Sequence, residues 1–173
     1  MRYSSILFPL VLATACGQTQ ATIEPMESVL RNGGGADVGR VTLRESGQRI
    51  QIRVRVSGLP PGLHGMHLHE AGRCEGPAFQ TAGGHLNPSG MHHGHQNPQG
   101  PHLGDLGNLR VGDDGRSDVT VEVPGAEART GLRSFLGLGQ SGLALVIHAE
   151  RDDEVTDPSG NSGARIACAV LGP

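Results

Sequence analysis

The sequence predicts an all-β fold, an antiparallel sandwich or barrel with two long loops. Residues 50–56 read IQIRVRV, where apolar and polar side chains alternate as in a strand with one buried face. Residues 119–123 repeat this pattern, and the 173 residues include 28 glycines and 11 prolines, which suits a chain with many turns. Only residues 126–136 come near the periodicity of an amphipathic helix. The length is enough for one domain with a hydrophobic core.

The first residues have the layout of a secretory signal. Arg2 precedes an apolar run, residues 6–15, that is too short to span a bilayer and ends in a small-x-small cleavage pattern. Cys16 follows directly, as in bacterial lipoproteins, whose cysteine at this place becomes the lipidated first residue. Plain secretion after cleavage of the same bond is the alternative. We expect a signal peptide at 1–15, a lipid-anchor cysteine and tether at 16–27, and a domain at 28–173 in the periplasm or cell envelope.

The strands are expected in order along the domain. Residues 41–44 and 50–56 form a hairpin with residues 45–48 as the turn. Residues 143–147 are continuously apolar, which is typical of a central strand. Apolar residues alternate again over 166–170, which predicts a last strand near the C-terminus.

Two long stretches interrupt this rhythm, at residues 70–103 and 150–163. Long loops in a compact domain are usually functional or disordered. The first contains five of the nine histidines, and the second follows His148 and leads to Arg165. The net charge of −3 and the absence of lysine give no sign of a nucleic-acid-binding surface.

The histidines indicate a metal centre. His67 and His69 are two residues apart, so on a strand both side chains point to one face. His148 ends the apolar run and could bring a third nitrogen from far along the chain. Imidazoles suit copper and zinc, and imidazoles with a carboxylate suit zinc. The further candidates in or beside the first loop are His85, His93, His102 and Asp105.

Each histidine also has an ordinary explanation. A single histidine on a strand is more often a hydrogen-bonded structural residue, and histidines in a Gly/Pro-rich loop are often only solvated. Spacing alone does not decide which of His92, His93 and His95 binds metal.

The cysteines agree with export. If Cys16 carries lipid, Cys74 and Cys168 remain, and two cysteines in an exported domain most simply form a disulfide. Closing so long a loop stabilises the fold by about 4–5 kcal/mol in the chain-entropy model. Two buried free thiols are the alternative.

Five separated motifs resemble the copper–zinc superoxide dismutase family of the bacterial secreted kind. They are HGMHLHEAGRC, AGGHLNPSGMHHG, NPQGPHLGDLGNL, LVIHAERDD and GNSGARIACAVLG, and the resemblance extends over roughly residues 28–173. It implies a Greek-key β-barrel of about eight antiparallel strands. It also implies copper redox cycling that converts superoxide to oxygen and hydrogen peroxide, beside a structural zinc.

The resemblance assigns roles residue by residue. Copper would be held by His67, His69, His85 and His148, and zinc by His85, His93, His102 and Asp105. The resemblance makes His85 the bridge between the ions and a carrier of a proton, and Arg165 the group that docks superoxide. It makes Asp152 a link between a copper histidine and a zinc histidine, His64 a structural residue, and Cys74–Cys168 the disulfide, and it leaves His92 and His95 as extras.

A different class of function stays open. An exported protein that only binds or buffers copper and zinc on the same scaffold would use the extra His92 and His95, and a structural or adhesive β-sandwich would explain the fold but not the ligands. Residues 149–163 carry five acidic side chains against Arg151 alone, which argues against strong steering of an anion. The sequence leaves the oligomeric state open.

Overall fold

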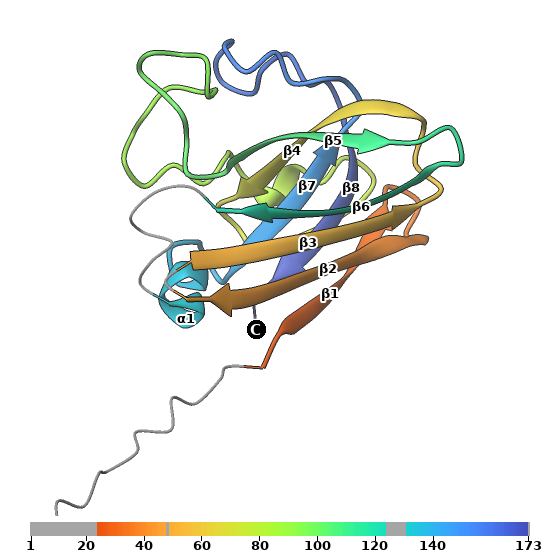
Figure 1. Ribbon diagram of the computed structural model, residues 1–173, viewed down its shortest axis with the longest axis horizontal. Coiled ribbons are helices and arrows are strands. Elements are labelled where there is room, and N and C mark those ends of the chain that lie inside the picture. The colour runs from red at the N-terminus through yellow and green to blue at the C-terminus, as the bar shows by residue number, and fades with distance from the viewer. Residues whose placement is uncertain (1–23, 48, 124–130, 173) are drawn as a thin grey trace, which may run out of the picture.

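Eight antiparallel strands form a single sheet in the computed structural model, which describes residues 24–47, 49–123 and 131–172 (Figure 1). The strands are β1 (Met26–Asn32), β2 (Asp37–Ser46), β3 (Arg49–Ser57), β4 (Gly62–His69), β5 (Asp105–Val111), β6 (Arg116–Glu122), β7 (Leu143–His148) and β8 (Arg165–Leu171). A 3-10 turn, η1 (Gln80–Ala82), and a short helix, α1 (Leu132–Leu136), lie in the connections. The expected signal peptide lies outside the described residues, and β1 begins at Met26, two residues before the expected start of the domain.

The strand order is β5-β4-β7-β8-β1-β2-β3-β6. The two edge strands, β5 and β6, follow each other in the chain through the turn at Gly112–Gly115, so the sheet curls into a nearly closed barrel. Around this barrel β4, β5 and β6 are consecutive and β7 returns beside β4, which is a Greek key. The predicted all-β Greek-key fold is therefore confirmed.

Alternation decides which side chains fill the barrel. In β3, Ile50, Ile52, Val54 and Val56 are buried and the residues between them face outwards, as predicted. All six residues of β7 are buried, as expected of a central strand. The β2–β3 hairpin pairs Val41 with Val54 and closes at Ser46 and Arg49.

The last strand is present, but its core-facing residues differ from the predicted alternation. Ala167, Ala169 and Leu171 join the main core, whereas Cys168 packs on the opposite face with Phe79 and Val146. The cysteine must point outwards from the barrel to meet Cys74, so the small alanines take the inward positions. Of the weak helix predicted at 126–136, residues 132–136 form α1, and residues 124–130 lie outside the described part.

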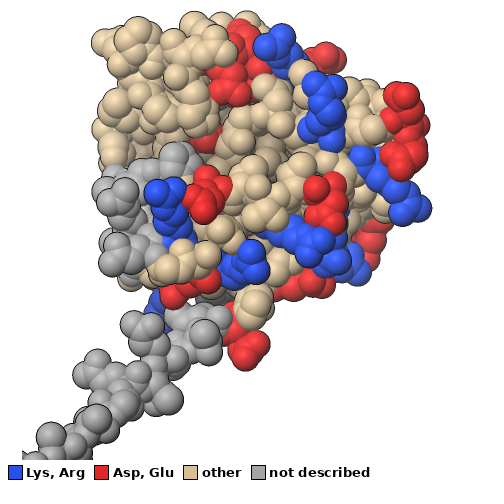
Figure 2. Space-filling model, viewed as in Figure 1, with Lys and Arg blue, Asp and Glu red and all other residues tan. Residues whose placement is uncertain are grey.

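Arginines and acidic side chains are interleaved over the outer face of the barrel shown in Figure 2. Exposed ion pairs between strands β1, β2, β3 and β6 include Arg49–Glu122, Arg53–Asp118, Arg55–Glu27 and Arg40–Glu27. Each exposed pair contributes only about 0–1 kcal/mol, so this face is an ordinary solvated surface. No helix in the described ranges is both long and apolar enough to cross a bilayer.

Candidate metal centre

Four histidines converge where β4 and β7 lie side by side. His67 and His69 project from one face of β4, and β4 pairs with β7, which ends at His148. A single bridge between His69 and His85 brings the long loop to the same place. One ligand nitrogen from each of these four histidines lies within 4.8 Å of the other three, and we call them the copper set.

The copper set presents lone pairs rather than protons. His67 Nε2 donates to Asp152 Oδ2 at 2.7 Å, and His69 Nδ1 donates to Gly83 O at 3.0 Å. His148 Nδ1 donates to Gly163 O at 3.2 Å. A neutral imidazole has one N–H, so in each of these rings the other nitrogen has a free lone pair.

Those other nitrogens have no partner in the protein. Among the described residues, the buried side-chain atoms without a hydrogen bond are His67 Nδ1, His69 Nε2, His85 Nε2 and His148 Nε2. Buried polar atoms are normally satisfied, because an unsatisfied one costs free energy. One nitrogen from each of four rings would be satisfied by a single cation, and imidazole nitrogen suits copper. The residues therefore fit a copper ion.

Burial keeps three of the four rings uncharged. It lowers the pKa of His69 to about 2, of His148 to about 3 and of His85 to about 4. The three rings are therefore neutral near pH 7, which is the form that binds metal.

A second group lies on the other side of His85. Asp105 Oδ1 is 3.0 Å from His85 Nδ1, 3.0 Å from His93 Nδ1 and 3.3 Å from His102 Nδ1. Tetrahedral zinc with bonds of about 2.0–2.1 Å places its ligand atoms about 3.3 Å apart. These three imidazoles and one carboxylate, the zinc set, therefore fit a zinc ion, with His85 shared between the two sets.

His67 also lies near the zinc set, in a group with His85, His93 and Asp105 whose ligand atoms are within 4.8 Å of one another. His67 Nε2 already donates to Asp152, and its Nδ1 faces the copper set. His102 Nδ1 faces Asp105 and is 3.4 Å from His85 Nδ1. We therefore assign His102, and not His67, to zinc.

The zinc set is highly charged without metal. Burial opposes ionisation of Asp105, but hydrogen bonds from His102, His85 and His93 lower its pKa below the usual range. Burial also lowers the pKa of His93, but its bonds to Asp105 and Asp152 raise that pKa to about 10. A protonated His93 thus lies between two carboxylates, and zinc must displace its proton.

Asp152 joins the two sets. Its Oδ2 accepts from His67 Nε2 at 2.7 Å, and its Oδ1 accepts from His93 Nε2 at 3.0 Å. Asn108 on β5, which sequence reasoning missed, donates to Asp152 O at 3.0 Å and accepts from Asp152 N–H at 2.8 Å. Gly160 has φ +63, and a Cβ there would lie 1.8 Å from Asp152 Oδ1, so this position requires glycine.

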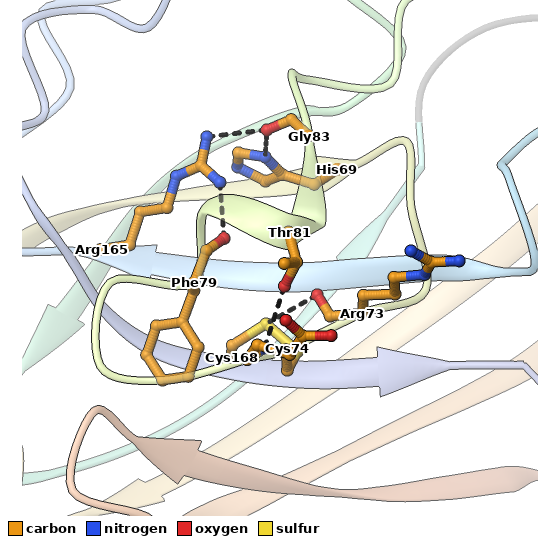
Figure 3. The surroundings of a disulfide bond; sticks show 9 residues. His69, Arg73, Cys74, Phe79, Thr81, Gly83, Arg165 and Cys168 are labelled. Atoms are coloured by element: carbon orange, nitrogen blue, oxygen red, sulfur yellow. Dashed lines mark hydrogen bonds between the residues drawn. A yellow bond between two sulfur atoms is a disulfide. The ribbon is translucent and has the colours of Figure 1, made fainter.

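Arg165 lies against the loop between Cys74 and His85 (Figure 3). Its Nη1 donates to Phe79 O and its Nη2 to Gly83 O, both at 2.7 Å. Gly83 O also accepts from His69 Nδ1, so one carbonyl connects the guanidinium to the copper set. Burial lowers the pKa of Arg165 from its high ordinary value, and the guanidinium stays charged. Backbone carbonyls leave no sequence signal, so these partners were not predicted.

The disulfide anchors that loop to β8. Cys74 and Cys168 are bonded, with a sequence separation of 94 and 5.7 Å between their Cα atoms. The predicted disulfide is confirmed. It ties the loop that carries Phe79 and Gly83 to the strand that begins with Arg165.

Comparison with known proteins assigns the family. The model of the family "Copper/zinc superoxide dismutase (SODC)" matches residues 38–171, which include both metal sets. The chain belongs to the copper/zinc superoxide dismutase family.

Relatives of this dismutase family match most of the chain. The superoxide dismutase-like protein YojM of Bacillus subtilis is 42% identical over 144 residues, covering 82% of this chain and 73% of the relative. Superoxide dismutase (Cu-Zn) 2 of Aquifex aeolicus is 41% identical over 143 residues, covering 82% of this chain and 83% of the relative.

Solved structures of this family are similar in fold to the chain. A crystal structure of a SOD-like protein from Bacillus subtilis has TM-score 0.76 at 40% identity, covering 84% of this chain and 97% of that chain. The Cu/Zn superoxide dismutase from Brucella abortus has TM-score 0.69 at 30% identity, covering 86% of this chain and 99% of that chain.

Three histidines lie outside both metal sets of this dismutase fold. His64 Nδ1 lies 2.8 Å from His148 O and its Nε2 lies 2.8 Å from Pro60 O, so the ring connects the end of β7 to the loop before β4. His92 and His95 are on the surface, each beside a carboxylate of residues 149–163.

The acidic residues of the 149–163 loop largely have local partners. Asp152 is buried between the metal sets. Asp153 accepts from Val155 N–H at 3.0 Å and from Thr156 N–H at 2.8 Å, and Glu154 and Asp157 bond to His95 and His92. Four of the five acidic side chains therefore have structural partners, and their negative charges remain beside the metal sets.

Proposed function

We propose that the chain catalyses dismutation of superoxide: two superoxide anions and two protons give one dioxygen and one hydrogen peroxide. The observation that carries the proposal is the set of four buried, unpartnered imidazole nitrogens next to a charged guanidinium. A protein that only stored metal would need no such cation beside the copper set.

The copper set would hold copper, which supplies one-electron redox chemistry that zinc lacks. The zinc set would hold the second ion and fix the long loop. Asp152 orients one histidine of each set through its two carboxylate oxygens.

Arg165 supplies the attraction for the anionic substrate. Its two bonds to Phe79 O and Gly83 O hold the planar guanidinium in one orientation. A fixed positive charge with several donors can attract and orient a small anion. The Gly83 carbonyl accepts from both Arg165 and His69, so it fixes the position of the guanidinium relative to His69.

His85 is suited to carry a proton. Its Nδ1 faces Asp105, and its buried Nε2 faces the copper set without a protein partner. Nε2 is therefore the atom that would hold a proton and pass it to the reduced oxygen species.

The test is superoxide consumption by purified protein loaded with copper and zinc. We expect catalysis well above an equal concentration of free copper with excess chelator, and its loss in His148→Ala. Full metal content with consumption at the background rate would refute the proposal and favour the storage function.

We also propose that the chain is exported and attached to a membrane by lipid on Cys16. The signal pattern at residues 1–15 supports this. In Figure 1, β1 starts on the side of the barrel away from the two long loops. The native protein should partition into detergent and Cys16→Ser should not. A native protein recovered wholly soluble with an unmodified Cys16 would contradict the proposal.

A further inference from the structure

The zinc arm, residues 91–105, contains two histidines that neither metal set uses. His95 Nδ1 donates to Glu154 Oε2 at 2.8 Å, and His92 Nδ1 bonds to Asp157 Oδ2. Both carboxylates belong to the 149–163 loop, so each pair joins the zinc arm to the facing loop. Within the described residues, neither histidine belongs to a group able to hold an ion.

Each carboxylate residue also holds a residue of the zinc site. Glu154 N–H donates to Asp152 Oδ1 at 2.6 Å, the same oxygen that accepts from His93 Nε2. Asp157 Oδ1 accepts from His93 N–H at 2.6 Å. His95 is therefore connected through Glu154 to Asp152, which orients His93, whereas His92 bonds directly to Asp157, which accepts from the His93 backbone.

Glu154 has a backbone conformation that needs support. Its φ is +64, in the left-handed region that side chains other than glycine rarely adopt. Three contacts hold it there: Oε2 with His95, Oε1 with Asn108 Nδ2 at 3.4 Å, and O with Gln96 N–H at 3.0 Å. This conformation lets Glu154 N–H reach Asp152.

The backbones of the two loops touch at this point. Gly94 has φ +99, and a Cβ there would lie 2.0 Å from Glu154 O. Only glycine allows this approach, and His95 follows it directly. The side chain of His95 therefore leaves the zinc arm where the arm lies closest to Glu154.

The two pairs differ in exposure. Glu154 is 15% exposed and His95 42%, whereas Asp157 is 43% and His92 51% exposed. Solvent screens the second pair more, so it should contribute less.

We propose that His95 and Glu154, with His92 and Asp157 as a weaker second pair, form a brace that positions Asp152 and His93 for zinc. His95 and Glu154 are positioning residues, because they act through Asp152 and not on the metal. The brace deepens the proposed function, but it rests on the zinc set alone and holds whether or not the protein turns over superoxide.

The experiment measures zinc affinity of the copper-free protein by competition with a chelator. His95→Ala should weaken zinc binding about 10-fold, within the range typical of residues that support metal ligands. His95→Asn should restore most of the affinity, because its amide nitrogen takes the place of Nδ1. His92→Ala, which breaks only the weaker pair of the brace, should change affinity less than about 3-fold.

Two further readouts separate positioning from ligation. Glu154→Ala should lower zinc affinity as His95→Ala does. The double variant should bind zinc as well as the single variant with the lower affinity, because both substitutions break the same chain of contacts. Cobalt placed in the zinc site should keep the same visible spectrum intensity in His95→Ala, since the ligand set is unchanged.

Zinc affinity within 2-fold of the native protein in His95→Ala would overturn the brace, as would additive losses in the double variant. A changed cobalt spectrum in both His95→Ala and His95→Asn would also overturn it, because His95 would then be a ligand. Superoxide consumption enters none of these measurements, so failure of the brace and failure of the proposed activity are distinguishable.

Discussion

Three of the four copper-set histidines stand on paired strands, whereas the residues particular to the zinc set lie on or at the end of one long loop. His67 and His69 are on β4 and His148 ends β7, and the β4–β7 register sets their separation. His93 and His102 belong to the loop that runs into β5 at Asp105. The paired strands therefore hold these three histidines of the copper set in fixed positions.

The electrostatics differ in the same way. The copper set is a group of buried rings, and three of them, His69, His85 and His148, are neutral because burial lowers their pKa values. The zinc set is a network of hydrogen-bonded charges around Asp105, with His93 held between Asp105 and Asp152. A site on a sheet can be left open because the strands hold it, whereas a site on a loop needs ionic contacts to keep its shape without metal.

The variant with the largest expected effect tests whether the copper set can lose its ion while the zinc set keeps its own. His148→Ala should lower superoxide consumption more than about 100-fold, because the loss of a ligand exceeds that of a supporting residue. Zinc should largely remain, since His148 is not in the zinc set. Metal analysis of the purified variant checks this against the native protein. Loss of both ions in His148→Ala would mean that the halves are not independent.

Arg165→Glu tests the charge on the copper side. Reversing it should slow catalysis by about one to two orders of magnitude, or roughly 1.4–2.8 kcal/mol, with copper and zinc content unchanged. Arg165→Lys should lose less, because it keeps the charge but not the two-pronged bonding to Phe79 O and Gly83 O. Rates at several salt concentrations complete the test: attraction predicts slowing with salt in the native protein. Unchanged dismutation by fully metallated Arg165→Glu would refute this role.

His93→Ala tests the zinc half alone. Zinc binding should weaken strongly while copper stays and part of the activity survives, because His93 is not in the copper set. His92 and His95 should not replace it, since their Nδ1 atoms are bonded to Asp157 and Glu154. The measurement is zinc content per copper. A greater zinc loss in His95→Ala than in His93→Ala would show that the ligand is at position 95.

The stability of the metal-free protein should fall on both sides of pH 6.5. The copper-set histidines cause the loss at acid pH, and His93 causes the loss at alkaline pH. His69, His85 and His148 have folded pKa values of about 2 to 4, below the ordinary 6.5. Below pH 6.5 the unfolded chain binds protons that the folded one does not, so stability falls by up to about 1.4 kcal/mol per pH unit for each ring. His93, with its pKa raised to about 10, contributes stability that is complete below pH 6.5 and is lost as pH rises towards 10.

Urea midpoints at pH 5, 6.5 and 8.5 should therefore be highest near pH 6.5. The variant His148→Gln should reduce the loss on the acid side only. A midpoint that rises from pH 6.5 to pH 5 would contradict the assignment of neutral rings to the copper half.

Local pattern determined much of this protein. Alternation in 50–56 predicted β3 and its buried face, and the two-residue spacing of His67 and His69 predicted that both rings share a side of β4. These features follow from the geometry of a single strand, so they can be read without knowing what lies beside it.

Only the tertiary structure determined which strands and loops contact one another. Only the β4–β7 pairing brought the His148 ring, at the end of β7, within 4.9 Å of the His67 ring. Only the contact of two loops showed that His93 enters the zinc set while His92 and His95 bond to Asp157 and Glu154. The inward face of β8 was set by the need of Cys168 to reach Cys74. Such choices depend on pairings between residues far apart in the chain, and the period of a strand carries no information about its neighbours.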